Sequence, residues 1–360
     1  MKVVIFAGGI GTRLWPLSRK NTPKQFEKII DDKSTLQLAY ERISPIFKPE
    51  DVYISSGIRY KEVILSQLPQ IPKENFIFEP EMRDIGAAVG LATAVLAKVS
   101  PGEPFMILWS DHLVKNEELF RQVITSAGEI LREDKNKIIF IGQSSRFASQ
   151  NLGWIEQGAL VKTMGELSVY EFKSFHYRPD LEKAEAFHKS ESHFWNPGYF
   201  GTTPSFLWSL YQKFAPEMYQ QLLKIQEAWG TDSFEKTLEE IYPTLEKISF
   251  DNLILEKIDP SDALVLGADL GWSDIGAWEA LKEALSENVD DNVTKGKVML
   301  EDSRDSLAFN FTDQLVVGID LDEMLVINTE DVILVCPKNS VPKIKKLVES
   351  LSGTPNENLT

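Results

Sequence analysis

The residues best suited to chemistry gather near the start of the chain, in a glycine-rich turn followed by cations. Gly8, Gly9 and Gly11 come directly after a short apolar run, and Arg13 and Lys24 follow them. Glycines allow positive φ angles and let a ligand approach the main chain closely. Backbone N–H groups exposed beside fixed cations form a cradle for phosphate groups. The segment therefore predicts a polyphosphate-binding loop, and the competing interpretation is an ordinary turn after a strand.

Two better-known phosphate loops do not fit this segment. A dinucleotide loop needs G-x-G-x-x-G at the start of a helix. Here Leu14 stands where the third glycine belongs, and Trp15-Pro16 prevents a helix from starting. A Walker loop needs G-x-x-x-x-G-K-[ST], and the segment lacks that ending. The cations Arg13 and Lys24 favour phosphate binding by a loop of another type.

Two carboxylates are the next candidates. Asp111 comes just after an apolar run at residues 105–109, and Asp274 lies in the segment LGWSDIG. Ligand groups sit at the carboxyl ends of strands in open α/β sheets, and carboxylates suit a hard cation bound to phosphates. The competing interpretation is that each aspartate caps the helix that follows it. Sequence alone does not pair residues this far apart.

Length and composition indicate a globular enzyme. The chain has 360 residues, 43% of them hydrophobic and 26% charged, which allows one large core and a small second domain. Its net charge of −16 argues against binding nucleic acid or an anionic membrane. The single cysteine, Cys336, excludes an intramolecular disulfide and a multi-cysteine metal site. No apolar run is long enough for a transmembrane helix or a signal peptide, so we expect a cytoplasmic enzyme.

Strand-like and helix-like segments alternate through the first part of the chain. Expected strands cover residues 3–7, 52–55, 76–78, 105–109 and 138–141, and expected helices cover residues 60–67, 85–99 and 119–131. This alternation predicts an α/β fold with a Rossmann-like, mostly parallel sheet flanked by helices. A hairpin of longer strands is expected at residues 154–161 and 168–175, and helices at residues 181–189, 205–213, 217–229 and 233–241.

The pattern changes after residue 285. Short apolar runs recur at roughly 8-residue intervals between polar turns, which predicts a small β-helix-like stack closed by a helix. We therefore expect one domain at residues 1–285 and a small β-helix-like C-terminal domain with a closing helix at residues 286–360. Residues from Ser352 on are polar and are expected to be disordered.

Several segments resemble the sugar-nucleotide pyrophosphorylases. GGIGTRLWPLSRKNTPKQF, residues 8–26, is similar to the N-terminal signature of that family, and its Trp-Pro-Leu-Ser variant resembles mannose-1-phosphate guanylyltransferases in particular. LWSDH at residues 108–112 and GWSDIGAW at residues 271–278 resemble two further family segments. The resemblance makes residues 1–285 a nucleotidyltransferase domain. It implies that Asp111 and Asp274 hold a catalytic Mg²⁺ ion.

The resemblance also implies a sugar-phosphate site, with one departure. FHYRP at residues 175–179 stands where the family has Phe-Val-Glu-Lys-Pro, so Tyr177 replaces a sugar-binding carboxylate. Arg178 keeps the charge of the phosphate-binding lysine and offers a bidentate fork. Asn196, in WNPG, matches an asparagine that binds the sugar, although it is also typical of a turn. The implied sugar-phosphate-binding residues are Lys24, Asp111, Glu171, Arg178 and Asn196.

The nucleotide site is implied in the same way. EPEMRD at residues 79–84 resembles a family segment, and the Asp84 carboxylate would accept hydrogen bonds from guanine N1–H and N2–H₂. The alternative is that Asp84 is a helix N-cap. Asp251, in SFDN, either orients the site or caps a helix. The implied nucleotide-binding residues are Gly8, Gly9, Gly11, Thr12, Arg13 and Asp84.

The activity implied is the synthesis of GDP-mannose and pyrophosphate from GTP and α-D-mannose 1-phosphate. Arg13 and Lys24 would be catalytic, and Mg²⁺ would be the cofactor. The alternatives are the same chemistry on another sugar 1-phosphate or nucleotide, and a non-catalytic regulatory role. A homodimer is the assembly to test. Bifunctional relatives carry a histidine-rich isomerase domain, and with four histidines this chain is not expected to have isomerase activity.

Overall fold

The structure, a computed structural model, describes residues 1–9, 12–19, 23–30 and 32–360. Two compact units divide the chain by their internal contacts. Unit 1 comprises Met1–Gly8, Ala39–Ser110 and Val114–Gly271, and unit 2 comprises Gly9–Leu38, Asp111–Leu113 and Trp272–Thr360. Unit 2 thus combines two short segments from the first third of the chain with the C-terminal segment. The boundary expected between domains at residues 1–285 and 286–360 stays a prediction.

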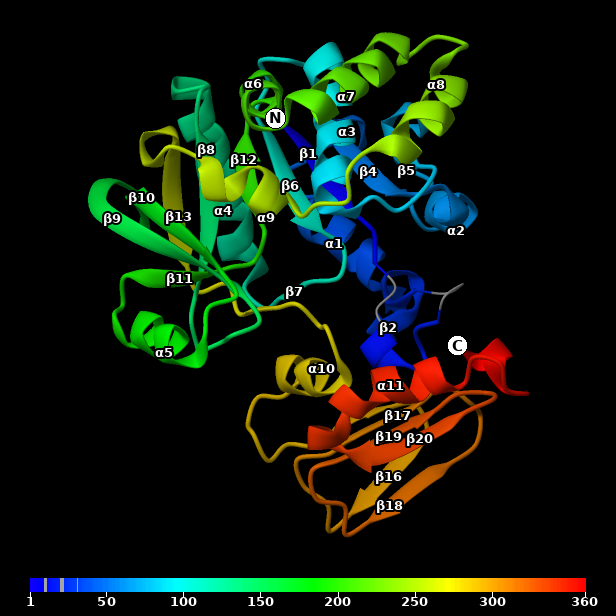
Figure 1. The fold of residues 1–360 in the computed structure, drawn as a ribbon. Helices are drawn as coiled ribbons and strands as arrows, with labels where there is room; N and C mark the ends of the chain where they lie inside the picture. The colour runs from blue at the N-terminus through cyan, green and yellow to red at the C-terminus, as the bar shows by residue number, and fades with distance from the viewer. Residues whose placement is uncertain (10–11, 20–22, 31) are drawn as a thin grey trace. The chain divides into compact units, whose positions relative to one another are not determined.

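Unit 1 is built on a ten-stranded sheet in the order β11-β9-β10-β13-β8-β12-β6-β1-β4-β5 (Figure 1). The strands are β1 (Lys2–Phe6), β4 (Val52–Gly57), β5 (Phe76–Glu79), β6 (Phe105–Trp109), β8 (Ile138–Ser144), β9 (Gly153–Met164), β10 (Leu167–Tyr177), β11 (His193–Asn196), β12 (Phe200–Thr202) and β13 (Ala263–Ala268). Apolar runs such as Val3–Ile5 are fully buried, as expected of strands covered on both faces. The α/β class is therefore confirmed.

The sheet is mixed rather than mostly parallel. Strands β6, β1, β4 and β5 pair in parallel, as do β8 and β13. The pairs β6–β12, β12–β8, β13–β10, β10–β9 and β9–β11 are antiparallel. The long hairpin of β9 and β10, which the sequence predicts, accounts for part of this difference, because a hairpin makes its two strands antiparallel.

Five of these strands close on themselves. β11 pairs with β9 on one side and with β8 on the other, so β8, β13, β10, β9 and β11 form a ring of pairings. Phe194 of β11 fills space that two glycines leave open. A Cβ on Gly142 would lie 2.7 Å from Phe194 Cβ, and one on Gly267 would lie 2.1 Å from Phe194 Cζ. Both positions therefore need glycine.

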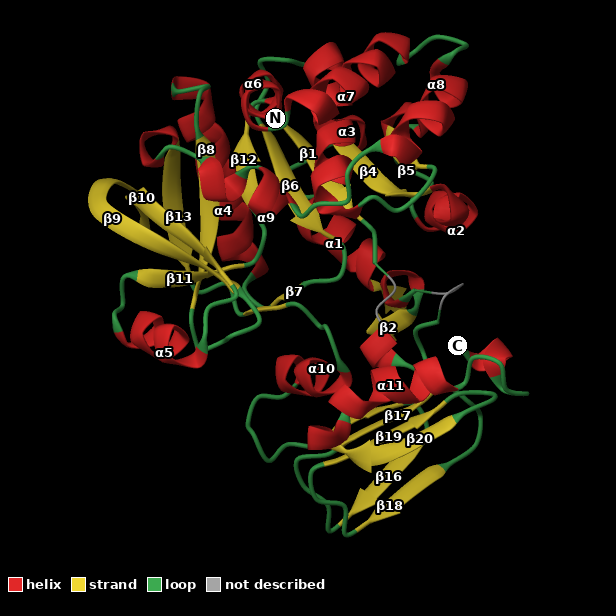
Figure 2. Cartoon of the chain, in the orientation of Figure 1, coloured by secondary structure: helices red, strands yellow, loops and turns green. Residues whose placement is uncertain are grey.

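Helices cover unit 1. They are α2 (Lys61–Gln67), α3 (Asp84–Val99), α4 (Glu117–Glu133), α5 (Leu181–Lys189), α6 (Pro204–Phe214), α7 (Pro216–Ala228), α8 (Phe234–Ile241) and α9 (Phe250–Leu253), with α1 (Thr35–Ile43) crossing from unit 2. Figure 2 shows α3, α6, α7 and α8 grouped together. Gly90 allows the close packing of α3, because a Cβ there would lie 2.6 Å from Leu222 Cδ1. Among the described residues, no helix combines the length and the apolar character needed to cross a membrane.

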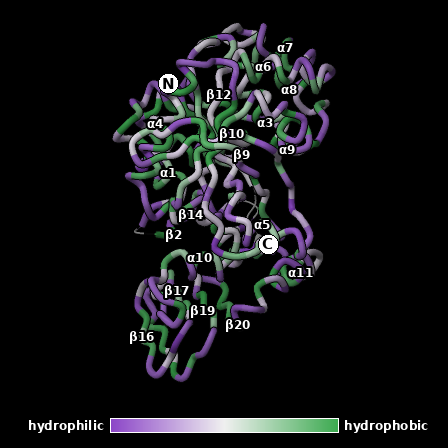
Figure 3. Tube along the Cα trace, turned by 90° about the vertical axis from the view of Figure 1, so that its left-hand side faces the viewer, coloured by the Kyte–Doolittle hydropathy of each residue, from purple (hydrophilic) through white to green (hydrophobic). Residues whose placement is uncertain are grey.

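Unit 2 contains the β-helix-like stack. β15 (Val293–Lys295), β17 (Leu307–Asn310) and β19 (Met324–Asn328) pair in parallel, and β20 (Ile333–Pro337) adds to β19 in antiparallel. β16 (Val298–Glu301) pairs in parallel with β18 (Val316–Ile319). Asn310 and Asn328 stack at matching positions, where Asn328 Nδ2 donates to Asn310 Oδ1 at 2.9 Å. In Figure 3, apolar and polar stretches alternate along these strands and turns.

The other elements of unit 2 complete its core. They are β2 (Lys28–Ile30), β3 (Lys33–Ser34), β14 (Trp272–Ser273), α10 (Trp278–Leu285) and α11 (Pro342–Ser350), while β7 (Leu113–Val114) crosses to unit 1. Leu14, Trp15 and Trp278 share one core with Phe309 of the stack. The disorder expected after Ser352 is wrong: a short 3-10 helix, Glu357–Leu359, lies there, and Trp15 Nε1 donates to Leu359 O at 2.7 Å.

Candidate functional site

The ion pair between Lys24 and Asp111 is the centre of the candidate site in unit 2. Asp111 lies in the turn after β6, and Lys24 opens a 3-10 helix, Lys24–Phe26. Lys24 Nζ lies 3.0 Å from Asp111 Oδ2, and the lysine side chain is only 8% exposed. Burial acts to raise the pKa of Asp111, but Lys24 and His112 lower it by more, so the net pKa lies below its ordinary value. The carboxyl is therefore ionised at neutral pH.

Asp274 belongs to the same cluster. Lys24 Nζ donates to Ile275 O at 2.9 Å and approaches Asp274 O at 3.5 Å. One buried ammonium therefore contacts both the Asp111 carboxylate and the backbone of the Asp274 segment. The structure thus brings together the two aspartates that the sequence could not pair.

Neither aspartate caps a helix, so the competing interpretation is wrong for both. The helix after Asp111 is α4, and its N-cap is Asn116, whose side chain accepts from Leu119 N. The helix after Asp274 is α10, whose N-cap position is Ala277, with no side-chain hydrogen bond. Both carboxylates are left without a helix-capping role.

Gly276 brings Arg13 into the cluster. A Cβ at Gly276 would lie 3.1 Å from Arg13 Nη2 and 3.3 Å from Asp274 Oδ2. The guanidinium and the carboxylate therefore both pack against this glycine. By contrast, Arg19, a nearby cation of the same basic segment, is engaged elsewhere, since its Nη1 and Nη2 donate to Asp331 at 2.7 and 2.5 Å.

Two residues of this cluster were missed by sequence reasoning. Glu279, in the first turn of α10, interacts electrostatically with Arg13 and Asp274, and burial raises its pKa. His112 lies 3.8 Å from Asp111 Oδ1, and its Nδ1 accepts from Trp272 Nε1 at 3.1 Å. Acidic residues are common in the first turn of a helix because they interact favourably with the helix dipole. The only sequence feature that could have pointed to a functional role for Glu279 is therefore its position directly after GWSDIGAW.

The glycine turn is partly described. Gly9 has φ +94°, and neither Gly8 nor Gly9 would bring a Cβ within 4 Å of another residue. Gln25 Nε2 donates to Gly9 O at 3.1 Å, which ties the turn to the segment that carries Lys24. Gly11, also expected here, lies outside the described residues. Thr12 begins a 3-10 helix, Thr12–Leu14. The open space around Gly8 and Gly9 suits a ligand close to the backbone.

Unit 1 aligns three of the residues expected near the sugar. Tyr177 and Asn196 are both register partners of Gly153, so they end β10 and β11 on either side of β9. Arg178 follows with φ +46°, and its Cζ lies 5.1 Å from the centre of the Tyr177 ring. Asn196 Oδ1 accepts from Gly198 N at 2.9 Å, so the turn interpretation also holds for this residue. Tyr177, Arg178 and Asn196 therefore gather at one end of three strands.

Trp109, the last residue of β6, supports this end of the sheet. Its Nε1 donates to Gly198 O at 2.9 Å, and a Cβ at Gly198 would lie 2.5 Å from that nitrogen. The indole thus fixes the turn after Asn196 against the carboxyl end of β6.

Asp251 of unit 1 is a partly buried acid with a raised pKa. Burial raises the pKa of Asp251, and Arg178 counters this in part, while Asp84 adds to it. Ser249, not Asp251, is the N-cap of α9. Asp84 is the first residue of α3, with φ +67°, and its Oδ1 accepts from Ile85 N at 2.7 Å. The N-cap position of α3 is Arg83, which makes no side-chain cap hydrogen bond, so the N-cap interpretation of Asp84 is wrong. Arg178 and Asp84 are thus each within electrostatic range of Asp251.

Glu171 is not brought to this group. It lies six residues before Tyr177 on β10, which corresponds to about 20 Å of strand. Its Oε2 accepts from Ala159 N at 3.3 Å, on the neighbouring strand. Glu171 therefore has no part in the proposed function.

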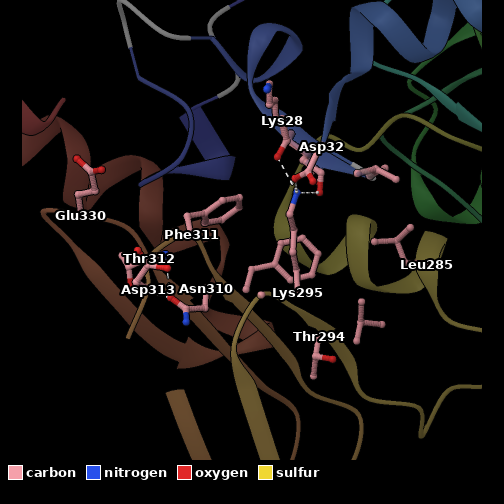
Figure 4. Close-up of a pocket in the computed structure, with 15 residues that line it drawn as sticks. Lys28, Asp32, Leu285, Thr294, Lys295, Asn310, Phe311, Thr312, Asp313 and Glu330 are labelled. Carbon is pink, nitrogen blue, oxygen red and sulfur yellow. Dashed lines mark hydrogen bonds and ion pairs between the residues drawn. The ribbon is translucent and has the colours of Figure 1, made fainter. Parts of the chain in front are cut away.

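One open pocket of about 910 Å³ lies in unit 2, and none of the expected site residues lines it. Figure 4 shows Lys295 at its centre, with its Nζ donating to Lys28 O and Ile29 O at 2.8 and 3.0 Å. The same ammonium lies 5.4 Å from the centre of the Phe311 ring. These contacts hold β2 against the β-helix-like stack, so Lys295 has a structural role in this pocket.

The donor set of the cluster fits Mg²⁺ in type. Asp111 and Asp274 offer carboxylate oxygens, the ligands that this hard cation prefers, and the low pKa of Asp111 keeps it ionised. Lys24 already neutralises Asp111 at 3.0 Å. A metal ion there would share the carboxylate with the ammonium.

Family models match nearly the whole chain. One described as "Nucleotidyl transferase" matches residues 2–291, and one described as "MannoseP isomerase/GMP-like beta-helix domain" matches residues 296–351. The β-helix-like character of the C-terminal region is therefore confirmed.

Relatives and solved structures agree with this match. Mannose-1-phosphate guanylyltransferase 2 of Escherichia coli O157:H7 is 30% identical over 97% of this chain and 73% of its own length. Mannose-1-phosphate guanylyltransferase ManC of Salmonella typhimurium is 29% identical over the same shares. The crystal structure of a mannose-1-phosphate geranyltransferase from Thermus thermophilus is 25% identical, with a TM-score of 0.86 over 98% of this chain and 99% of that one. The chain therefore belongs to the nucleotidyl transferase family.

Proposed function

We propose that this chain is a mannose-1-phosphate guanylyltransferase, which makes GDP-mannose and pyrophosphate from GTP and α-D-mannose 1-phosphate. The names of its relatives point to that reaction. The observation that carries the proposal is the cluster of Lys24, Asp111, Asp274 and Arg13 in unit 2. Two cations and two carboxylates in one place are what the transfer of a charged phosphoryl group requires.

The reaction is an in-line displacement at phosphorus. A phosphate oxygen of mannose 1-phosphate attacks the α-phosphorus of GTP, and the bond from that phosphorus to the bridging oxygen of the β-phosphate breaks. Positioning and charge neutralisation supply the rate, with little covalent chemistry left to the protein. Lys24 would hold the α-phosphate and the incoming sugar phosphate. Arg13 would neutralise the negative charge that develops on the departing pyrophosphate.

Asp111 and Asp274 would hold Mg²⁺. When bound, the ion would neutralise charge on phosphate oxygens. Lys24 would then exchange part of its contact with Asp111 for a phosphate oxygen. The buried position of the ammonium, 8% exposed, supports this role, because a desolvated cation attracts phosphate strongly.

Unit 1 would recognise the guanine base, the sugar and the sugar phosphate. Asp84 would accept hydrogen bonds from guanine, and Asn196 would bind sugar hydroxyls. Arg178 would bind the sugar phosphate as a bidentate fork. Tyr177, with a phenol in place of a carboxylate, would contact the sugar less strongly. The gathering of Tyr177, Arg178 and Asn196 at one end of β10, β9 and β11 supports these roles.

A substrate panel tests the proposal. Pyrophosphate release is measured with each of four nucleoside triphosphates and with mannose, glucose and other sugar 1-phosphates, with and without Mg²⁺. We expect release with GTP and mannose 1-phosphate, dependent on Mg²⁺. Release with another pair alone would reassign the substrates. No release with any pair, from a chain that melts cooperatively, would favour a non-catalytic role.

A homodimer is supported by exposed apolar side chains on the β-helix-like stack. Met299 and Val317 are register partners on β16 and β18, and with Ile319 they are 56–62% exposed. Exposed apolar groups of this kind mark interaction surfaces. Sedimentation of the wild type and of Val317→Lys would show a dimer and its loss. A cytoplasmic location stays a prediction.

A further inference from the structure

We propose that Glu156, His176 and His193 form a site for a transition-metal dication on unit 1, best suited to Zn²⁺. Among the residues that the structure describes, this group alone brings at least three His, Cys, Asp or Glu ligand atoms within 4.8 Å of one another. The site is separate from the carboxylate cluster of unit 2. It does not rest on the proposed function.

The strand register creates the site. Glu156 on β9 is the register partner of both His193 on β11 and Ser174 on β10. His176 lies two residues beyond Ser174, and residues two apart on a strand share a face. Three neighbouring strands therefore each present one ligand on the same face of the sheet, at a position fixed by backbone hydrogen bonds.

Hydroxyl groups orient these ligands. Ser190 Oγ and Ser192 Oγ lie 2.8 and 3.1 Å from His193 Nδ1, so with Nδ1 protonated the Nε2 lone pair of His193 is available to a metal. Ser174 Oγ donates to Glu156 Oε2 at 2.7 Å and lies 2.9 Å from His176 Nε2. Metal-binding histidines are held in this way by hydrogen bonds to their other nitrogen.

The surroundings favour metal binding to imidazole. The Phe187 ring of α5 stacks on His193 with centroids 4.1 Å apart, and lies 4.8 Å from the His176 ring. Figure 1 shows α5 beside β11, where it covers this face. Lys173 Nζ is 3.5 Å from Glu156 Oε1, but its side chain is 57% exposed and free to swing away.

The ligand types select the metal. Two imidazoles and one carboxylate suit Zn²⁺, whereas Mg²⁺ prefers oxygen ligands alone. Bonds of about 2.0–2.2 Å to Zn²⁺ require ligand atoms closer together than 4.8 Å, which rotation of the partly exposed side chains provides. Three protein ligands leave a fourth position for water.

The site lies on the opposite face of the strands from the residues expected at the sugar. His176 and Tyr177 are consecutive on β10 and point to opposite faces, and the same holds for Trp195 and Asn196 on β11. Trp195 shares the face of His193. A metal ion here would therefore link β9, β10 and β11 on the face opposite Tyr177 and Asn196, without contacting the sugar.

Metal titration of the full chain tests the site. Zn²⁺ is titrated against a chromophoric chelator, in millimolar Mg²⁺ to fill oxygen sites, and Co²⁺ absorption reports the ligand geometry. We expect one equivalent of tight binding in the wild type, with a Co²⁺ spectrum typical of four-coordinate nitrogen–oxygen ligation. His176→Ala and His193→Ala should each lower Zn²⁺ affinity at least tenfold. Thermal melting should rise with Zn²⁺ in the wild type and not in these variants.

His188→Ala is the matched control. His188 lies on α5 near the site, but its Nδ1 is 2.8 Å from Ser145 Oγ and it is not one of the three ligands. Its Zn²⁺ affinity should equal that of the wild type. Glu156→Gln, which keeps the size of the side chain, guards against unfolding as the cause of any loss. Equal affinity in the wild type, His176→Ala and His193→Ala, or no binding by a folded wild type, would overturn the proposal.

Discussion

Asp111 of unit 2 and Glu79 of unit 1 are carboxyl groups whose pKa values are shifted in opposite directions. In unit 2, Asp111 faces the ammonium of Lys24 and the ring of His112, and its pKa lies below the ordinary value. In unit 1, burial raises the pKa of Glu79 to about 7, and it raises the pKa of Asp251 as well. The nearest partner of Glu79 is the neutral Tyr242 hydroxyl, which donates to its Oε2 at 2.5 Å.

The difference lies in the groups that surround each carboxyl group. The Asp111 carboxylate of unit 2 is held ionised beside the Lys24 ammonium, a setting that suits phosphates and Mg²⁺. Glu79 of unit 1 is partly buried beside a neutral hydroxyl, a setting that favours the uncharged carboxyl group. The contrast agrees with the phosphate chemistry proposed for the cluster of Lys24 and Asp111.

Removing the charge of Asp111 should have the largest effect. Asp111→Asn keeps the size of the side chain but leaves Lys24 without its 3.0 Å anionic partner and removes a metal ligand. We expect turnover to fall by about a thousandfold, the scale of losing a main electrostatic contact. Pyrophosphate release under saturating Mg²⁺ measures it. Asp232→Asn, an exposed aspartate of unit 1, is the control and should keep wild-type turnover.

Removing Arg13 should have the next largest effect. Arg13→Ala takes a cation from beside Asp274 and Gly276. Because charge develops on the leaving pyrophosphate, the loss should appear in turnover, by about a hundredfold, with little change in KM. Arg19→Ala is the matched control, since Arg19 is paired with Asp331 instead. Similar kinetics in the two variants would contradict the cradle assigned to the glycine turn.

The sequence predicts individual helices and strands better than it predicts which other elements they pair with. The expected strand at residues 105–109 and helix at residues 181–189 are β6 and α5 with the same bounds. Their signals are local: a continuous apolar run for the strand, and an Asp180 cap for the helix. The strand β13 (Ala263–Ala268) was missed, because its apolar run is short and its partners, β8 and β10, are distant in the chain.

The candidate site divides in the same way. Motif resemblance selected Lys24, Asp111 and Asp274, but only the fold places Lys24 against both aspartate segments. The set of Glu156, His176 and His193 had no motif at all, since it arises from the register of three strands. Long-range pairing of this kind leaves no periodic trace in one strand. Glu171 shows the reverse case: the family resemblance selected it, but the fold does not place it beside Tyr177, Arg178 and Asn196.

Glu79 offers a test of unit 1 through stability. Its folded pKa, about 7, lies above the unfolded value, so the folded chain binds more protons in this range. The stabilisation is fully present below the unfolded pKa and is lost as pH rises through about 7. Glu79→Gln should remove this loss, which for a partly exposed group amounts to about 2 kcal/mol. Urea unfolding at acidic and at mildly alkaline pH measures the difference.

The control for this test is Glu74→Gln, because Glu74 is exposed. The wild type and Glu74→Gln should lose stability alike between the two pH values, while Glu79→Gln should lose less. Equal losses in all three proteins would show that Glu79 ionises normally. The contrast between the two units would then rest on Asp111 and Asp251 alone.

Tyr177 should give the smallest effect, on the choice of sugar. Its side chain is 39% exposed at the end of β10, level with Asn196 across Gly153. A carboxylate accepts charge-assisted hydrogen bonds that are roughly twice as strong as those of a neutral group. The phenol should therefore distinguish hydroxyl epimers less strictly. We expect the wild type to use mannose 1-phosphate while rejecting glucose 1-phosphate only moderately.

Tyr177→Glu should sharpen that preference by about fivefold, the equivalent of roughly 1 kcal/mol. The ratio of kcat/KM for the two sugars measures it, and Tyr177→Phe separates the hydroxyl group from the ring. The new carboxylate would also replace the ring that Arg178 contacts at 5.1 Å. Part of the Arg178 charge would then be paired, so KM for both sugar phosphates should rise together. A rise in KM with an unchanged sugar ratio would mean that residue 177 acts on the phosphate through Arg178, and that Asn196 and its neighbours choose the sugar.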